Sequence, residues 1–281
     1  MAVAQRHFPH DITTLIIDIL GEGLLDEDDT DCRPVLANCL LVSRSFCHHS
    51  RRHLFRAVSL QNSPIDSFFE RVAQLREIMA PLSNPLLGMI KYIKVFSVEI
   101  FSDPTKTVYR EHDAGLATIL KAFIRSDSHL EEFGLWGCYI QWQRLGRTVH
   151  NLIRSIIRLP SLSTIHLSGL DGVPVSILTG ASCKNLHLRK LKMGECTNGR
   201  ASTLNVPQLQ LEAFATDDSF PLEYLSSNGR RAELPNVSTS PFSHLKKLAL
   251  ELDSGSSNRW GPIVLSEGMR SLREMDIVFR T

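Results

Sequence analysis

Four potential metal ligands lie close together near the start of the chain: Cys39, Cys47, His48 and His49. Zinc fingers hold their metal with cysteines about two to four residues apart and histidines about three to five residues apart. Here seven residues separate the two cysteines and the histidines are adjacent. On a helix, adjacent side chains diverge by about 100°. The spacing therefore does not favour a metal site.

Two charged clusters flank this segment. Six of the ten residues from Glu22 to Asp31 are acidic, but the ligand and glycine spacing of a helix–loop–helix calcium site is missing, so a solvated loop is expected. Arginines at positions 44, 51, 52 and 56 could contact phosphates. The run is short and follows the acidic loop, which favours a solvated helix face.

The remaining chemistry is bounded by composition and by missing motifs. The sequence contains no Walker loop, dinucleotide fingerprint, nucleophile elbow or His-Glu-x-x-His motif, so we expect a non-enzymatic protein without a cofactor. With 281 residues, 43% hydrophobic residues and a net charge of +1, the chain is typical of a folded protein without a general preference for nucleic acid or membranes. The first residues lack an apolar signal core, so a cytoplasmic or nuclear location is expected.

The elements that carry the first cluster are three predicted short helices. Ile12, Leu15, Ile16, Ile19 and Leu20 have the spacing of one helix face, with Asp11 at its start and glycines 21 and 23 at its predicted end. A second helix follows Pro34, and a third is predicted up to Arg56. Three short helices make a small core, which usually needs a neighbour or a partner to cover its apolar surface.

These helices carry a family resemblance. The segment Phe8-Pro9-His10-Asp11-Ile12 resembles the Leu-Pro-x-Glu-Ile opening of the F-box, and Ile16 to Leu20 is similar to its continuation. The segment Cys39 to Phe46, CLLVSRSF, resembles the Cys-x-Leu-Val-Ser-Arg-x-Phe/Trp centre of the motif, and Arg52 to Arg56 resembles its close in fungal F-box proteins. Phe8 and Asp11 replace the usual Leu and Glu, and the acidic loop is longer than in the minimal motif.

The resemblance implies that residues 8–56 form a docking module. Such a module binds a Skp-type adaptor and, through it, the cullin scaffold of a ubiquitin ligase. The residues that would face the adaptor are Pro9, Ile12, Ile16, Leu20, Leu40, Val42, Ser43 and Phe46. The alternative for each apolar residue in this set is packing within the chain.

The rest of the chain, residues 57–281, contains a loose repeat of the form apolar-x-x-apolar-x-apolar. It begins at Ile90, Leu130, Leu162, Leu188, Leu211, Leu245 and Leu272, with Thr216 in place of the last apolar residue in the fifth copy. Helical apolar spacing lies between the early copies. The pattern predicts an α/β fold in which short strands alternate with helices or loops, an irregular leucine-rich-repeat-like solenoid. A doubly wound α/β fold is the structural alternative.

In such a solenoid, the residues between the apolar positions face an open, concave surface. Candidate target-binding residues on this surface are Tyr92, Lys94, Phe96, Trp136, His166, Lys190 and Lys192. Tyr92 and Trp136 are the preferred anchors, because tyrosine and tryptophan often dominate the energy of protein interfaces. Packing at the end of the solenoid or under a loop is the alternative for both.

Together these patterns predict the substrate-recognition subunit of a cullin-based ubiquitin ligase, with a protein target of unknown identity. A scaffold protein of the same fold without ligase coupling is the alternative, and an enzyme is a more distant one. The chain ends four residues after Ile277, so we also expect the last strand to be uncapped and weakly held.

Overall fold

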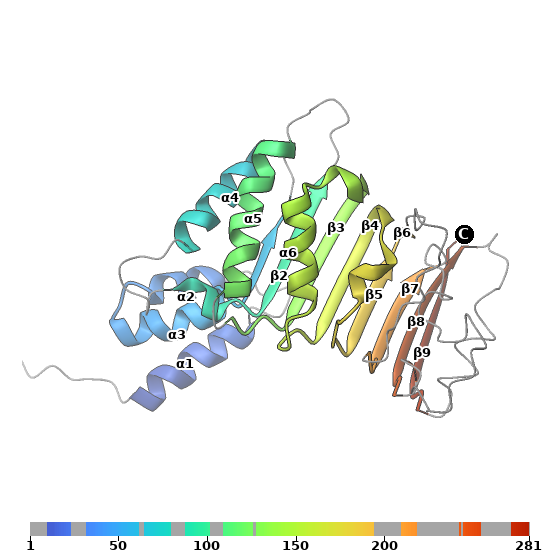
Figure 1. Ribbon diagram of the computed structural model, residues 1–281. Coiled ribbons are helices and arrows are strands. Elements are labelled where there is room, and N and C mark those ends of the chain that lie inside the picture. The colour runs from blue at the N-terminus through green and yellow to red at the C-terminus, as the bar shows by residue number, and fades with distance from the viewer. Residues whose placement is uncertain are drawn as a thin grey trace, which may run out of the picture.

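In a computed structural model of the chain, the described residues are 10–23, 32–61, 65–79, 88–101, 109–125, 128–193, 209–217, 242, 244–253 and 271–280. They form an α/β fold with six α-helices and one nine-stranded parallel sheet (Figure 1). Helices α1 (His10–Gly23), α2 (Cys32–Cys39) and α3 (Arg44–Leu54) come first. They pack against one another at the end of the sheet where β1 lies.

The sheet is built in chain order, with every pair of neighbouring strands parallel. The first four strands are separated by helices: β1 (Ala57–Leu60), α4 (Ile65–Met79), β2 (Val95–Phe101), α5 (Tyr109–Arg125), β3 (Glu132–Gln141), α6 (Arg147–Ile157) and β4 (Thr164–Val173). The later strands are β5 (Asn185–Arg189), β6 (Lys192–Met193), β7 (Ala213–Asp217), β8 (Lys247–Asp253) and β9 (Glu274–Arg280). Short 3₁₀ turns lie at Met89–Tyr92 (η2), Trp142–Arg144 (η3) and Val175–Leu178 (η4).

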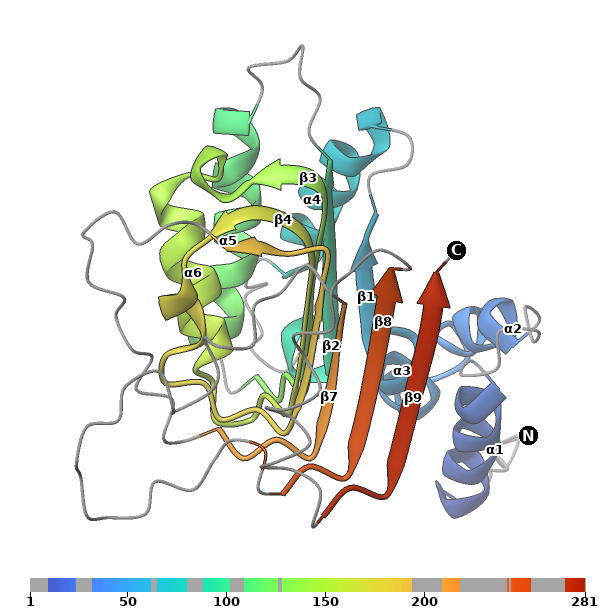
Figure 2. The ribbon, with the colours of Figure 1, turned by 90° about the vertical axis from the view of Figure 1, so that its right-hand side faces the viewer.

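The order β1-β2-β3-β4-β5-β7-β8-β9 has no reversal, and β6 pairs with β4. A doubly wound sheet reverses its strand order and carries helices on both faces. Here α4, α5 and α6 cover one face of the sheet, and Figure 2 places α5 and α6 on the opposite side from α1, α2 and α3. The described elements therefore do not follow the doubly wound alternative.

Alternation along the strands explains the core. Phe96, Phe133, Ile165, Leu186 and Phe214 lie side by side in the pairing register, and each is at most 1% exposed. The predicted helical faces pack against this row: Leu116, Ile119, Leu120 and Phe123 from α5, and Val149, Ile153 and Ile156 from α6. Together they form the central apolar layer between the sheet and its helices.

A second regularity lies just before the strands. One backbone carbonyl in each unit accepts hydrogen bonds from two successive N–H groups of the next unit. The carbonyls of Arg56, Lys94, Glu131, Ser163, Lys184, Glu212 and Lys246 all do so. Because the same arrangement recurs from β1 to β9, it defines one equivalent position in every unit of the sheet.

This register corrects two of the predicted repeats. The copy assigned to Ile90, Ile93 and Val95 is Ile93, Phe96 and Val98, because Phe96 pairs with Phe133. The copy assigned to Leu188, Leu191 and Met193 is Cys183, Leu186 and Leu188, because Leu186 pairs with Ile165. Shifts by three and by five residues are odd, so they exchange the two faces of the strand. The other predicted copies lie in the expected register.

Candidate functional site

Helix α1 buries a narrow face and exposes a broad apolar one. Thr13, Ile17 and Gly21, four residues apart, are buried. Asp18 of α1 contacts His53 of α3, with Oδ1 2.8 Å from Nε2. A Cβ on Gly21 would lie 2.0 Å from the His53 ring, so only glycine permits this approach and the helix runs through Gly21 rather than ending there. The opposite face, with Ile12, Leu15, Ile16 and Ile19, is left exposed.

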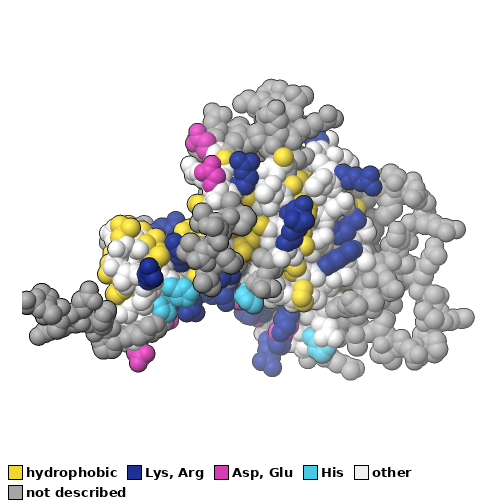
Figure 3. Space-filling model, turned by 60° about the vertical axis from the view of Figure 1, so that its left-hand side comes forward, with side chains coloured by type: hydrophobic (Ala, Val, Ile, Leu, Met, Phe, Trp, Pro, Cys, Tyr) yellow, Lys and Arg dark blue, Asp and Glu magenta, His cyan; other side chains and the backbone are white. Residues whose placement is uncertain are grey.

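Exposed apolar side chains gather on these three helices. Of the eleven large hydrophobic residues exposed in the described part of the chain, seven belong to α1, α2 and the turn after α2. We call these seven the head apolar surface: Ile12, Leu15, Ile16, Ile19, Val35, Leu41 and Val42. Figure 3 shows hydrophobic side chains clustered on this part of the molecule. An apolar patch of this kind marks an interaction site more often than a scattered single residue does.

The residues expected to face an adaptor lie partly on this surface. Ile12, Ile16 and Val42 belong to it, while Leu20, Leu40 and Phe46 are half-buried. Ser43 is the N-cap of α3, where its Oγ accepts a hydrogen bond from the Phe46 N–H at 3.3 Å. Pro9 lies outside the described residues. Leu41, which is 87% exposed, was absent from the predicted set although it adjoins Val42.

The second surface is the sheet face opposite helices α4, α5 and α6. The alternating positions of β3 and β4 place Glu132, Gly134, Trp136, Thr164, His166 and Ser168 there, as expected. The corrected register of β5 adds Asn185, His187 and Arg189, which the sequence reading had not assigned to this face. We call this surface the open face.

Four of the predicted target-binding residues lie elsewhere. Phe96 is fully buried in the core, so its assignment to the open face is wrong. Tyr92 is 8% exposed in η2, and its hydroxyl lies 3.0 Å from Nδ1 of His48 in α3, so it serves the joint between helices and sheet. Lys94 precedes β2 and pairs with Glu131. Lys190 lies in the turn after β5.

Three aromatic rings stack across the centre of the open face. The ring centroids of Trp136 and His166 are 6.0 Å apart, and those of His166 and His187 are 4.2 Å apart, with nearly parallel planes in the second pair. Trp136 leans over Gly134, where a Cβ would lie 2.1 Å from the indole ring. Gly134 is the residue that pairs with His166 in the register of β3 and β4. Because Gly134 has no side chain, the Trp136 indole fills the position beside His166.

Charge is distributed unevenly within this stack. Nε2 of His166 lies 3.2 Å from Oε1 of Glu132. That hydrogen bond lowers the pKa of Glu132, against the opposing effect of burial. Burial, and then the charges of His166 and Arg189, lower the pKa of His187 to about 4. At neutral pH the stack therefore combines a carboxylate held by His166 with an uncharged imidazole at His187.

In the described part of the chain, the two stacked histidines make aromatic contacts and one ion pair, with Glu132. Neither His166 nor His187 is hydrogen-bonded to a serine, threonine or cysteine in the described part of the chain, as nucleophilic catalysis would require. Among the same residues, no group of three or more His, Cys, Asp or Glu side chains is placed to hold a metal ion. The rings of His48 and His49 lie edge to face with centroids 5.5 Å apart, and Cys39 and Cys47 are free cysteines.

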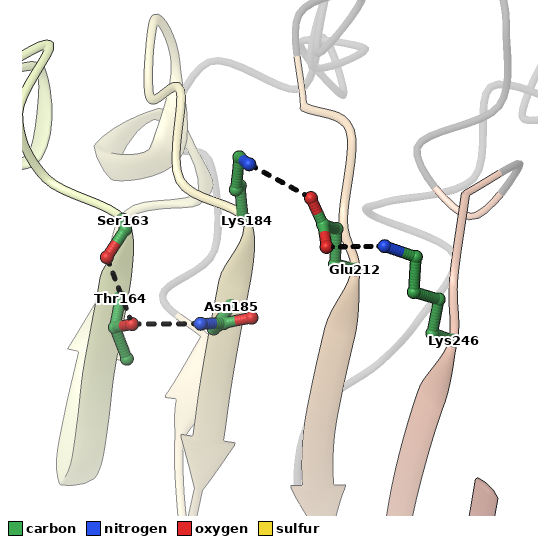
Figure 4. A network of polar contacts seen from close by, with 6 residues as sticks. All are labelled: Ser163, Thr164, Lys184, Asn185, Glu212 and Lys246. Carbon is green, nitrogen blue, oxygen red and sulfur yellow. Dashed lines mark hydrogen bonds and ion pairs between the residues drawn. The ribbon is translucent and has the colours of Figure 1, made fainter. Parts of the chain in front are cut away.

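Lysines just before the strands are held in ion pairs. Glu212 bridges Lys184 and Lys246 at 3.0 and 2.8 Å (Figure 4). Hydrogen bonds from Lys246 and then Lys184 lower the pKa of Glu212 to about 2. In the next row Lys247 pairs with Glu274, which raises the pKa of the lysine. These pairs tie β5, β7, β8 and β9 together at their amino ends.

The carboxyl end of β5 differs from this edge. Arg189, Lys190 and Lys192 are exposed, and none of them forms an ion pair within the residues that the structure describes. Lys190 has a positive φ of 50°, and its backbone N–H donates to the carboxylate of Asp217. This turn leads to β6, where Lys192 lies opposite Asp171 of β4.

None of the helices in the described part of the chain is long and apolar enough to cross a membrane. Comparisons with models of protein families, with curated proteins and with solved structures found no match to this chain.

Proposed function

We propose that this protein is the substrate-recognition subunit of a cullin-based ubiquitin ligase. Residues 8–56 act as an F-box-like module that binds a Skp-type adaptor, and residues 57–281 act as an irregular leucine-rich-repeat-like solenoid that holds a protein target. The protein itself catalyses no covalent step. It raises the effective concentration of the target near the site of ubiquitin transfer by binding the adaptor and the target at the same time.

The observation that carries the docking proposal is the head apolar surface. Ile16 is 42% exposed whereas the adjacent Ile17 is fully buried, so the three helices are packed yet keep apolar side chains in water. Transfer of apolar surface from water to a partner gains about 25 cal/mol per Å². A partner that covers this surface would therefore bind with a substantial hydrophobic contribution.

The arrangement of the sheet supports the second half of the proposal. The strands follow one another in chain order with one in-register apolar row, as stacked repeats do. The open face carries exposed and half-buried polar and aromatic side chains, which suits recognition of a protein surface.

The docking half is tested by co-purification of the full chain with a Skp-type adaptor. Ile16→Asp puts a charge into the proposed interface, and we expect it to abolish recovery of the adaptor. Ile78→Asp is the matched control, because Ile78 is a 45% exposed isoleucine on α4, outside the head apolar surface. This control should recover as much adaptor as the unchanged chain.

Equal adaptor recovery by the Ile16→Asp variant and the unchanged chain would refute the docking assignment. Recovery of the adaptor without the cullin scaffold would favour the scaffold alternative instead. A circular dichroism spectrum of each variant establishes that the helices are retained, so that loss of binding is not loss of folding.

A further inference from the structure

The charged side chains of the open face and its edges differ in whether they have a partner within the chain. Three of its carboxylates have partners: Glu132 is bonded to His166, Glu274 to Lys247, and Asp217 accepts from the Lys190 N–H. The lysines at the amino ends of the strands, Lys94, Lys184 and Lys246, are also paired. At the carboxyl end of β5, by contrast, none of Arg189, Lys190 and Lys192 forms an ion pair among the described residues.

The backbone keeps these cations together. Arg189 and His187 are two residues apart on β5, so their side chains leave the same face about 7 Å apart. The Asp217 carboxylate holds the N–H of Lys190 in a turn with positive φ, and this turn carries the chain to Lys192 on β6. Asp217 thus fixes the backbone of the turn and leaves the lysine side chain exposed.

The stacked rings lie beside Arg189, the first of these cations. Ser168 of β4 is opposite Arg189, and Trp136 of β3 is opposite Ser168. His187 is half-buried and makes no hydrogen bond in the described part of the chain, so a ring nitrogen is available to a ligand. A cationic edge beside an aromatic row suits a segment that carries both carboxylates and an aromatic side chain.

We propose that the carboxyl end of β5, with Arg189, Lys190 and Lys192 next to the Trp136–His166–His187 stack, binds an acidic peptide segment of the target. This inference rests on the proposed function, because it names the chemistry of the target that the open face holds. A nucleic acid is disfavoured, because the chain has a net charge of only +1 and the neighbouring acids Glu132 and Asp217 interrupt any continuous basic track.

The test measures fluorescence anisotropy of a short fluorescein-labelled peptide of repeated Glu-Glu-Tyr units with the full chain. We expect saturable binding that weakens with added salt, and no binding of the matched Gln-Gln-Tyr peptide. The double variant Arg189→Gln with Lys192→Gln should weaken binding about tenfold, since each exposed ion pair contributes up to about fivefold in affinity. The control Lys184→Gln with Lys246→Gln removes two lysines at the other end of the strands and should change affinity less than about twofold.

Equal affinity for the Glu-Glu-Tyr and Gln-Gln-Tyr peptides would overturn the inference, as would equal weakening by the two double variants. Tighter binding of a fluorescent oligo-uridine than of the acidic peptide would replace it with nucleic-acid recognition. The docking proposal fails separately. Ile16→Asp should lose the adaptor and keep the peptide, while Arg189→Gln with Lys192→Gln should do the reverse.

Discussion

His166 and His187 are neighbouring imidazoles whose surroundings differ. His166 has a carboxylate partner in Glu132, whereas His187 has the cation Arg189 two residues along its own strand and the small side chain of Ala215 opposite it on β7. Two charged imidazoles with centroids 4.2 Å apart would repel each other. The stack is therefore stable with the Glu132 carboxylate bonded to His166 and with His187 neutral.

We predict that acid destabilises the protein through His187. Its pKa is about 4 in the folded protein, against 6.5 for an unperturbed histidine such as that of the unfolded chain. Between pH 4 and pH 6.5 His187 binds a proton more readily in the unfolded chain than in the folded protein. The contribution of neutral His187 to the free energy of unfolding is therefore complete above pH 6.5 and is lost as the pH falls toward 4. The expected loss is about 1–2 kcal/mol, after allowance for solvent screening of a half-buried group. Urea unfolding at stepped pH measures it.

The matched variant is His187→Gln, which keeps a polar side chain but does not titrate. Its free energy of unfolding should fall less than that of the unchanged chain over this pH window. The two proteins differ only at position 187, so the difference between their pH profiles reports on His187. Parallel pH profiles of the two proteins would contradict the prediction. Glu132, whose pKa is lowered, adds its own loss only at more acidic pH.

At the scale of elements, the sequence pattern predicted the existence of helix α1 but not which of its faces is buried. The spacing of Ile12, Leu15, Ile16 and Ile19 predicted a helix correctly, but those side chains are exposed. Burial falls instead on Thr13, Ile17 and Gly21, and the missing Cβ at Gly21 allows His53 of α3 to approach closely. Sequence periodicity identifies an apolar face without specifying whether this chain or a partner covers it.

This division predicts opposite responses at adjacent isoleucines. Ile17→Ala removes a fully buried side chain and should cost about 2–5 kcal/mol. Ile16→Ala shortens a side chain on the head apolar surface and should cost less than about 1 kcal/mol. Chemical unfolding followed by far-ultraviolet circular dichroism measures both. Equal costs at the two positions would mean that the exposed face of α1 is covered within the chain.

The strands were predicted with similar success and a similar limit. Five of the seven template copies lie in the expected register, and the faces of α5 and α6 pack as predicted. The two errors arose because Ile93 and Leu188 each fit the template at more than one position. In the structure, the buried Cys183 takes the first apolar position of the copy that ends at Leu188. Burial also raises the pKa of its thiol to about 12, which keeps it an uncharged core side chain.

The open-face stack shows what the sequence left unassigned. His187 and Arg189 were missed because an odd error in register moved them to the wrong face of β5. Trp136 and His166 were placed correctly, but their contact depends on Gly134, and no spacing rule states that the indole leans back over its own strand. Predicting which side chains touch across neighbouring strands therefore requires the pairing register of those strands.

At the scale of the whole molecule, the head helices and the sheet are joined at several points. Only two residues separate α3 from β1, and the Arg56 carbonyl accepts from the N–H groups of Lys94 and Val95 at the start of β2. The Tyr92 hydroxyl of η2 lies 3.0 Å from His48 of α3. A receptor that must hold a target in one direction relative to its adaptor would need such a joint.

We predict that head and sheet unfold together and that Tyr92→Phe weakens their coupling. The substitution removes the hydroxyl contact with His48 but keeps the buried ring, so the free energy of unfolding should fall by about 1 kcal/mol. The same substitution made in a His48→Ala background should cost much less, because the contact is already lost. Hydrogen exchange of α3 and of β2 in urea should converge on one unfolding transition in the unchanged chain. If α3 exchanges through a separate, lower transition that Tyr92→Phe leaves in place, the joint is flexible and the two parts are independent.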